Sequence, residues 1–183
     1  MQSLNFLQRE IRSLQRTIIL LPYEDLPFTV LFVDGNHENF DLLFSYPISQ
    51  WNGGKVHIIR SDIIHLMRGQ IFELEGNTIF TFGGATSIDK YMRTEGLTWW
   101  ALEVPTHEEL DEGIANLKRY NNKVDYIITH SCGERALMYP PLRTRNFQMG
   151  RYPEKWYFGH YHLDGRLNDK MTVLYQEIVP LGE

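Results

Sequence analysis

Three short histidine-containing segments hold the residues of this chain that are best suited to chemistry. They read GNHE at residues 35–38, TH at 129–130 and GHYH at 159–162. Each comes at the end of an apolar run that favours a buried strand, namely FTVLFV, VDYIIT and KWYF. Loops that leave neighbouring strands of an open α/β sheet meet at one edge of that sheet. We therefore expect the three segments, which are far apart in sequence, to come together in space.

The side chains that would meet at this edge form a ligand set for a divalent metal. They are Asn36, His37, His130, His160 and His162. Imidazole nitrogen and amide oxygen suit Mn, Fe, Zn or Ni better than ions that prefer thiolate. His160 and His162 are two residues apart, so in extended chain both rings would point to the same side. That spacing favours one ring for each of two metal ions.

Each segment taken alone also has a simpler interpretation. His130 could be an ordinary loop residue after a strand, and GHYH could be an aromatic-rich turn. GNHE could be the start of a helix, with Asn36 or Asn39 as its N-cap. The order of the segments and the strands that precede all three favour a common site.

The elements that must position these residues follow from the apolar pattern. Strands are expected at residues 28–33, 56–59, 63–67, 70–74, 78–82, 124–129, 155–158 and 171–178, with a hairpin turn at 75–77. Helices are expected at 3–16, at about 38–44 and after Thr106, where Glu109 completes a capping box. Strands with helices between some of them indicate a layered α/β fold.

Composition limits the class of protein and its partners. The chain has 183 residues, 43% of them hydrophobic and 22% charged, which predicts one globular domain over 1–183 and excludes a disordered or coiled-coil chain. No apolar stretch is long enough to span a membrane. The net charge of -5 disfavours binding to nucleic acid or anionic lipid. The single cysteine, Cys132, and the lack of a secretory signal predict a cytoplasmic location.

The three segments, in this order, resemble the signature of the calcineurin-like metallophosphoesterases, which runs D-x-H, G-D, G-N-H-[DE], H and G-H-x-H. The similarity covers about residues 27–180, and stretches such as LPFTVLFVDGNHENFD, FTFGGATS and EGLTWW look like a small bacterial or phage subgroup. The resemblance implies a layered metallophosphoesterase-type β-sandwich flanked by helices. It also implies a hydrolase that cleaves a phosphate mono- or diester, with nucleic acid as a partner only if it is the substrate.

The resemblance assigns a role to each residue of the predicted site. Asn36, His130 and His160 would bind one metal ion, and His162 would bind the other. His37 would protonate the leaving oxygen and would be held by a neighbouring carboxylate. Two divalent ions can clamp phosphate oxygens and lower the pKa of a bound water to near neutrality. The implied cofactors are therefore two ions of the Mn, Fe, Zn or Ni kind.

The first two blocks of the signature are absent, because neither D-x-H nor G-D occurs before residue 35. The N-terminal β-α-β portion of the family is therefore missing or replaced, and residues 1–26 form an atypical segment. Asp34 could be proposed as a substitute ligand, but its place at a strand end argues against that role. With fewer ligands, this chain could hold one ion or none.

Three hypotheses stay open for a chain with this pattern. It could be an active phosphoesterase, a catalytically silent relative that binds a phosphorylated ligand or a protein, or a structural fragment. In the third case a homo-oligomer would cover the exposed sheet edge that the missing portion leaves.

Some residues outside the three segments also have candidate roles. Arg93, in a loop at residues 85–100, could grip a substrate phosphate, whereas Trp100 is expected to pack on the core. His57 and His65 alternate with apolar neighbours and are expected to be half-buried strand residues. A positive rim or a solvated loop is expected from four further arginines: Arg135, Arg143, Arg145 and Arg151.

Overall fold

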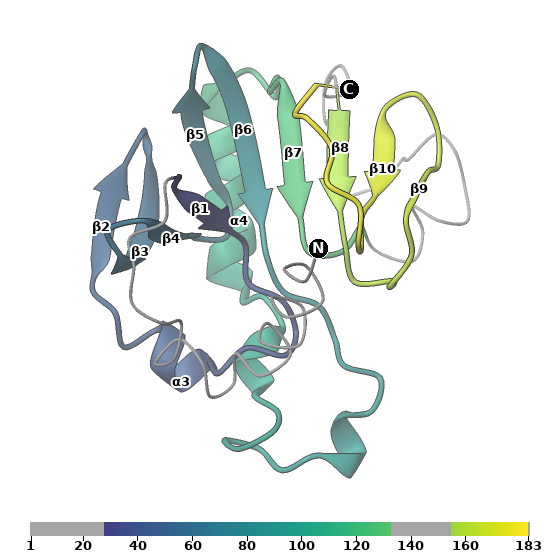
Figure 1. Ribbon diagram of the computed structural model, residues 1–183. Helices are drawn as coiled ribbons and strands as arrows, with labels where there is room; N and C mark the ends of the chain where they lie inside the picture. The colour runs from purple at the N-terminus through teal and green to yellow at the C-terminus, as the bar shows by residue number, and fades with distance from the viewer. Residues whose placement is uncertain (1–27, 133–154, 183) are drawn as a thin grey trace.

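Residues 28–132 and 155–182 are described by the computed structural model of this chain. In that part the chain forms two β-sheets with few helices, which is a mixed α/β arrangement (Figure 1). The expected helix at 3–16, the atypical segment 1–26 and the four arginines of the expected rim lie outside the described residues.

The first sheet has four strands in the order β1-β4-β3-β2. Their bounds are Val30–Phe32 for β1, Ile48–Trp51 for β2, Gly54–Arg60 for β3 and Ile63–Leu66 for β4. β1 runs parallel to β4, whereas β2, β3 and β4 form an antiparallel meander. Among the described strands, β1 pairs with β4 alone, so it is an edge strand there.

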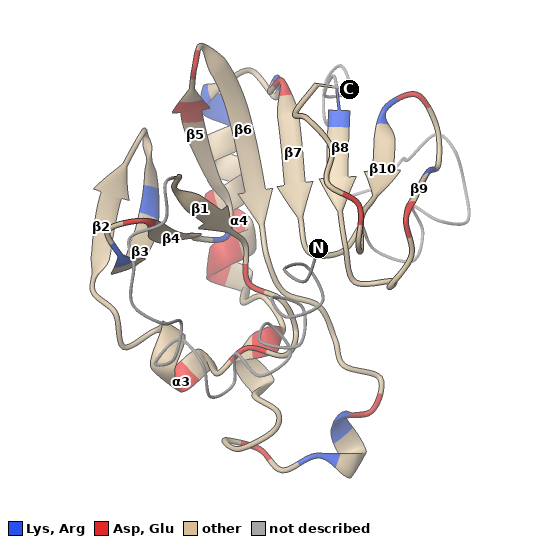
Figure 2. Cartoon of the chain, in the orientation of Figure 1, with Lys and Arg blue, Asp and Glu red and all other residues tan. Residues whose placement is uncertain are grey.

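The second sheet has six strands in the order β5-β6-β7-β8-β10-β9. Their bounds are Gln70–Leu74 for β5, Asn77–Phe82 for β6, Tyr126–Thr129 for β7, Lys155–Phe158 for β8, Gly165–Arg166 for β9 and Met171–Val173 for β10. β6, β7 and β8 are parallel, so their carboxyl ends lie at the same edge (Figure 1). β6 and β7 carry no charged residue along their length, as expected for central strands (Figure 2).

Within residues 28–132 and 155–182, two α-helices lie between these strands in sequence, α3 at Phe40–Leu43 and α4 at His107–Arg119. Short 3-10 turns occupy Lys90–Met92 (η1) and Ala101–Glu103 (η2). The side chain of Asn39 caps α3 by accepting from the amide of Leu42, so Asn36 is not the cap. The expected capping box of α4 is present. None of the described helices has the length and apolar character needed to cross a lipid bilayer.

Apolar clusters hold the layers in the order α3, first sheet, second sheet, α4. Phe40 and Leu43 of α3 pack with Phe32 and Ile59 of the first sheet and with Trp100, which is buried as expected. Between the sheets lies a cluster of Val56, Ile64, Leu66 and Phe72. On the other face of the second sheet, α4 contributes Leu117 to a cluster of Ile71, Phe80, Val124 and Ile127.

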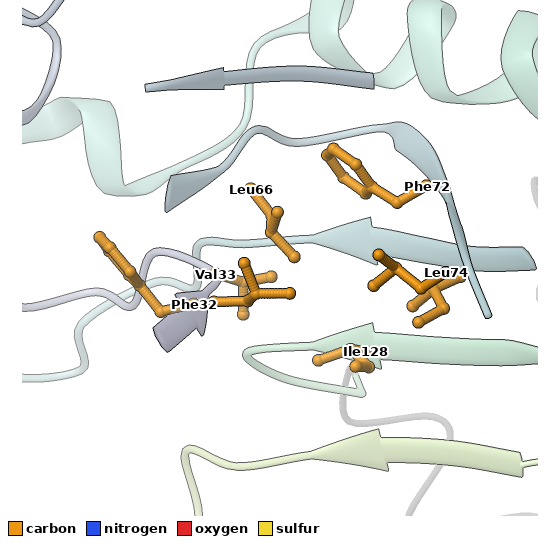
Figure 3. Close-up of a pocket in the computed structure, with 8 residues that line it drawn as sticks. Phe32, Val33, Leu66, Phe72, Leu74 and Ile128 are labelled. Atoms are coloured by element: carbon orange, nitrogen blue, oxygen red, sulfur yellow. The ribbon is translucent and has the colours of Figure 1, made fainter. Parts of the chain in front are cut away.

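A pocket of about 90 Å³ remains between the two sheets (Figure 3). Its lining is entirely apolar: Leu31, Phe32, Val33, Leu66, Phe72, Leu74, Ile79 and Ile128. A lining without polar side chains gives water no hydrogen-bond partners, so the pocket belongs to the hydrophobic interior.

A buried ion pair joins the end of β1 to β4 and α4. Asp34 is fully buried, and its carboxylate accepts from Arg68 at 2.7 and 2.9 Å and lies 3.1 Å from His65 Nε2. Arg68 also donates to Glu109 of α4 at 3.0 Å. Burial alone raises the pKa of Asp34, but the hydrogen bonds and charges of His65 and Arg68 outweigh it and lower that pKa. Asp34 is therefore committed to this pair, in agreement with the argument against it as a ligand.

Several element expectations were wrong in detail. β2 and β9 were not foreseen, and the last strand ends at Val173 instead of residue 178. It ends early because Asp164 accepts from the amides of residues 175–177, which would otherwise extend the ladder.

His57 and His65 are fully buried, not half-buried, because they face each other across β3 and β4 with their Nδ1 atoms 3.0 Å apart.

Replacing Gly83 by alanine should disrupt the Asp34 ion pair. A Cβ at position 83 would lie 2.1 Å from Asp34 Oδ1 and 2.7 Å from its backbone oxygen. Displacing one partner of a buried pair costs about 3 kcal/mol or more, so we expect Gly83→Ala to lower the free energy of unfolding by that amount. Urea denaturation measures it, with Gly165→Ala as control because a Cβ there meets nothing within 4 Å. Equal effects of the two substitutions would contradict this role of the pair.

Acid should destabilise the fold through His57. Burial, and then the charge of His65, lower the pKa of His57 to about 4 from its ordinary 6.5. Between these values the unfolded chain binds a proton that the folded chain does not. The contribution of His57 is therefore complete above pH 6.5 and is lost as the pH falls toward about 4, by about 1.4 kcal/mol per pH unit.

We expect His57→Gln to reduce this pH dependence. The free energy of unfolding is measured by guanidinium denaturation at about pH 7.5 and about pH 5, on protein freed of metal with a chelator. His107→Gln is the control, because His107 is exposed. A pH slope unchanged by His57→Gln but reduced by His107→Gln would contradict the assignment.

Candidate functional site

Three of the predicted ligands converge in the structure. Asn36 follows β1, His130 follows β7 and the His160 loop follows β8. Asn36 Oδ1 lies 3.0 Å from His130 Nε2, and that same nitrogen lies 3.1 Å from His160 Nδ1. The contacts join residues 94 and 30 positions apart in the chain. The loops of His130 and His160 leave neighbouring parallel strands of one sheet, as the sequence pattern predicts, whereas Asn36 reaches them from β1 of the other sheet.

Gly35 allows the close approach of two of these loops. A Cβ at this position would lie 3.0 Å from Cε1 of the His130 ring. The amide of Gly35 donates to Glu38 Oε1 at 3.2 Å, which fixes the turn that carries Asn36. Burial raises the pKa of Glu38, against the effect of this hydrogen bond. The GNHE segment therefore needs its glycine for packing and its glutamate for the turn.

Both imidazoles of the cluster are held in the neutral form. Burial and, to a smaller extent, the charge of His160 lower the pKa of His130 to about 4. Burial, and then the charge of His162, lower the pKa of His160. A neutral ring has a nitrogen lone pair, which is what a metal ligand requires. At neutral pH the cluster can thus offer two imidazole nitrogens and one amide oxygen.

Two of the distances between these three atoms are ones that ligands of a divalent transition metal can have. Two ligand atoms that each lie about 2.1 Å from one ion, at a right angle, are about 3.0 Å apart. The distances from His130 Nε2 to Asn36 Oδ1 and to His160 Nδ1, 3.0 and 3.1 Å, have this length. Among the described residues there is no group of three or more His, Cys, Asp and Glu side chains suited to a metal. Beside the two imidazole rings, the cluster contains the amide oxygen of Asn36.

His37 lies at the margin of this cluster, under the influence of the 85–100 loop. Its Nε2 is 3.3 Å from Asn36 Nδ2, and its side chain is exposed. Burial of part of the ring, and then the charge of Arg93, lower the pKa of His37, whereas Asp89 and Glu103 act to raise it. Asp89 and Glu103 thus act on His37 through their charge, and the expectation that a carboxylate holds the ring stays a prediction.

Arg93 lies in this loop as an ion-paired residue. It donates to Asp89 Oδ2 at 2.7 Å and to the backbone oxygen of Thr98 at 3.2 Å. Its Nε is buried without a hydrogen-bond partner among the described residues. Its role as a phosphate ligand stays a prediction.

The expectation that His160 and His162 lie in extended chain was wrong. The backbone is not extended there, because φ is +74° at His160 and +54° at His162. The two rings therefore do not point to the same side as in a strand. The His162 ring is exposed and stacks on Tyr175 with centroids 4.9 Å apart. Binding of a second metal by His162 stays a prediction without this geometric support.

Two residues next to the cluster were not foreseen from the sequence, Ser87, which contacts Asn36, and Glu103, which contacts Ser87. Asn36 Nδ2 donates to Ser87 Oγ at 2.9 Å, and Ser87 Oγ donates to Glu103 Oε2 at 2.6 Å. Ser87 comes shortly after β6, which ends at the same edge as β7 and β8. The strand-end argument, applied to β6 as well, would have pointed to it. Glu103 has no comparable signal in the sequence.

Comparison with known proteins adds no further assignment. No protein-family model, no curated protein sequence and no solved structure matches this chain. Because a fold alone does not define a function, the chemistry of the site residues is the basis for the function.

Replacing His130 should remove the metal-binding capacity of the cluster. His130 Nε2 is in both of the short contacts, so its loss leaves only two donors. We expect His130→Ala to weaken Mn²⁺ binding by about a hundredfold or more, measured by titration calorimetry. His107→Ala is the matched control, because that histidine is exposed in the first turn of α4. Wild-type affinity in His130→Ala would place the metal elsewhere.

Proposed function

We propose that this chain is a metal-dependent phosphoesterase that hydrolyses a phosphate mono- or diester by attack of an activated water. The observation that carries the proposal is the convergence of Asn36, His130 and His160. The order of the three segments, which resembles the metallophosphoesterase signature, supports it. So do the two sheets, with a helix packed on the outer side of each.

The chain's own residues would hold the ion by three atoms. These are Asn36 Oδ1, His130 Nε2 and His160 Nδ1. A divalent ion such as Mn²⁺, when bound, polarises phosphate oxygens and lowers the pKa of a coordinated water. His162 is the residue on which a second ion would depend.

His37 is the proposed acid for the leaving oxygen. It lies directly beside Asn36, so a phosphate at the cluster would come within reach of its ring. The lowered pKa of His37 reflects burial and the positive charge of Arg93. A bound phosphate would bring negative charge to both residues, which favours the protonated imidazole. Arg93 would pair with the phosphate and hold its orientation.

A second candidate is a module that binds a phosphorylated ligand without turnover. Among the described residues, no carboxylate is in hydrogen-bond contact with the three donor atoms of the cluster. Asp34, the carboxylate next to the GNHE segment, is used by His65 and Arg68. A site with only three neutral donors is better suited to one ion than to two.

Metal content and turnover separate the two candidates. The full chain is equilibrated with Mn²⁺, its metal content is measured, and hydrolysis of p-nitrophenyl phosphate and bis(p-nitrophenyl) phosphate is followed. We expect bound Mn²⁺ and turnover that a chelator and His160→Ala both abolish. Bound Mn²⁺ with phosphate binding but no turnover would favour the second candidate. Absence of bound Mn²⁺ would overturn the phosphoesterase, and absence of both Mn²⁺ and phosphate binding would overturn both.

His37→Ala should impair catalysis according to the leaving group. A positioned acid contributes about 10²–10⁴-fold when the leaving oxygen needs a proton. We expect a loss in kcat of this size with phenyl phosphate and a much smaller loss with p-nitrophenyl phosphate, whose leaving group is more acidic. Mn²⁺ content should be unchanged, because His37 is outside the three-atom cluster. Equal losses with both esters would exclude His37 as the acid.

A further inference from the structure

We propose that Ser87 and Glu103 are positioning residues that fix which side of the Asn36 amide faces the metal. This inference rests on the proposed metal site and adds a determinant of its affinity. It starts from a chain of hydrogen bonds that leads from the cluster into the interior, through Asn36, Ser87 and Glu103.

Glu103 determines the direction of the first hydrogen bond. Its side chain is fully buried, and its two oxygens accept from Ser87 Oγ at 2.6 Å and from the Ser87 amide at 2.7 Å. A carboxylate can only accept hydrogen bonds, and a serine hydroxyl has a single hydrogen to donate. The hydrogen of Ser87 is therefore committed to Glu103, and Ser87 Oγ can only accept from any further partner.

Ser87 then determines the orientation of the Asn36 amide. Of the two ends of that amide, only the NH₂ group can donate to Ser87 Oγ, which lies 2.9 Å from Nδ2. The carbonyl oxygen must therefore point the other way, where it lies 3.0 Å from His130 Nε2. The reversed amide would place two acceptors against each other at Ser87.

The orientation of the Asn36 amide matters because only one end of an amide can bind a metal. The carbonyl oxygen has lone pairs and the NH₂ group has none to offer. The two ends have nearly the same shape, so packing alone does not distinguish them. Asn36 and Ser87 are 6% and 2% exposed, which leaves water little access to replace a lost partner. The buried hydrogen bonds thus select the end that ligates.

Glu103 also places a buried carboxylate two hydrogen bonds away from Asn36, where it would favour a bound cation. Ligand orientation by such outer partners accounts for about 10–100-fold in metal affinity.

Ser87→Ala tests the proposal in the full chain, with Mn²⁺ as the probe. We expect the Kd for Mn²⁺ to rise about 10–100-fold, measured by titration calorimetry. Ser61→Ala is the matched control, because Ser61 is exposed in the turn between β3 and β4. If Ser87→Ala does not fold, the isosteric Glu103→Gln gives the same test. The glutamine can donate to Ser87, which frees the serine hydrogen and removes the preference at Asn36.

Asn36→Asp separates orientation from a general structural role. A carboxylate has an oxygen at both ends, so its ligating end needs no selection. In the Asn36→Asp variant a carboxylate oxygen faces Ser87 Oγ, which can only accept. We therefore expect Ser87→Ala not to raise the Kd of that variant, although it weakens the wild type about 10–100-fold. Equal losses in both backgrounds, or no loss in the wild type, would overturn the positioning role alone. Failure of the wild type to bind Mn²⁺ would instead overturn the metal site itself.

Discussion

The buried ion pair between Asp34 and Arg68 is the interaction on which the rest of the arrangement depends. Asp34 has no solvent exposure, and its carboxylate takes two hydrogen bonds from one guanidinium. The same guanidinium contacts Glu109 of α4 and the backbone oxygen of Leu102. One group therefore ties together the end of β1, the turn before α4 and α4 itself. Because the GNHE segment follows Asp34 directly, the ion pair holds in place the point at which the first loop of the site begins.

The sequence could predict the part of the site that depends on where the strands end. The apolar runs before His130 and His160 became β7 and β8, which are parallel neighbours in one sheet. Backbone hydrogen bonds continue past the strands, from the His130 amide to Phe82 and from the Gly159 amide to His130. The convergence of His130 and His160 follows from this continuation and from the general rule for α/β sheets. The approach of Asn36 does not, because β1 belongs to the other sheet.

The features that could not be predicted depend on contacts that the local pattern does not contain. The positive φ at His162 is a property of a loop whose course is set by its surroundings. Burial of His57 depends on its cross-strand partner, and the early end of β10 depends on the carboxylate of Asp164. Ser87 and Glu103 matter only through Asn36, which is 51 residues away from Ser87. Alternation and capping rules act over a few residues and do not reach such pairs.

The long sequence separation within the cluster has a consequence for folding. Asn36 and His130 are 94 residues apart, and His160 comes near the end of the chain. Closing such a loop carries an entropic cost that only the packed sheets can repay, so contacts of this range form late and slowly. During synthesis at about 5–20 residues per second, the three donors coexist only once most of the chain has emerged. An ion held by all three would thus report that both sheets have assembled.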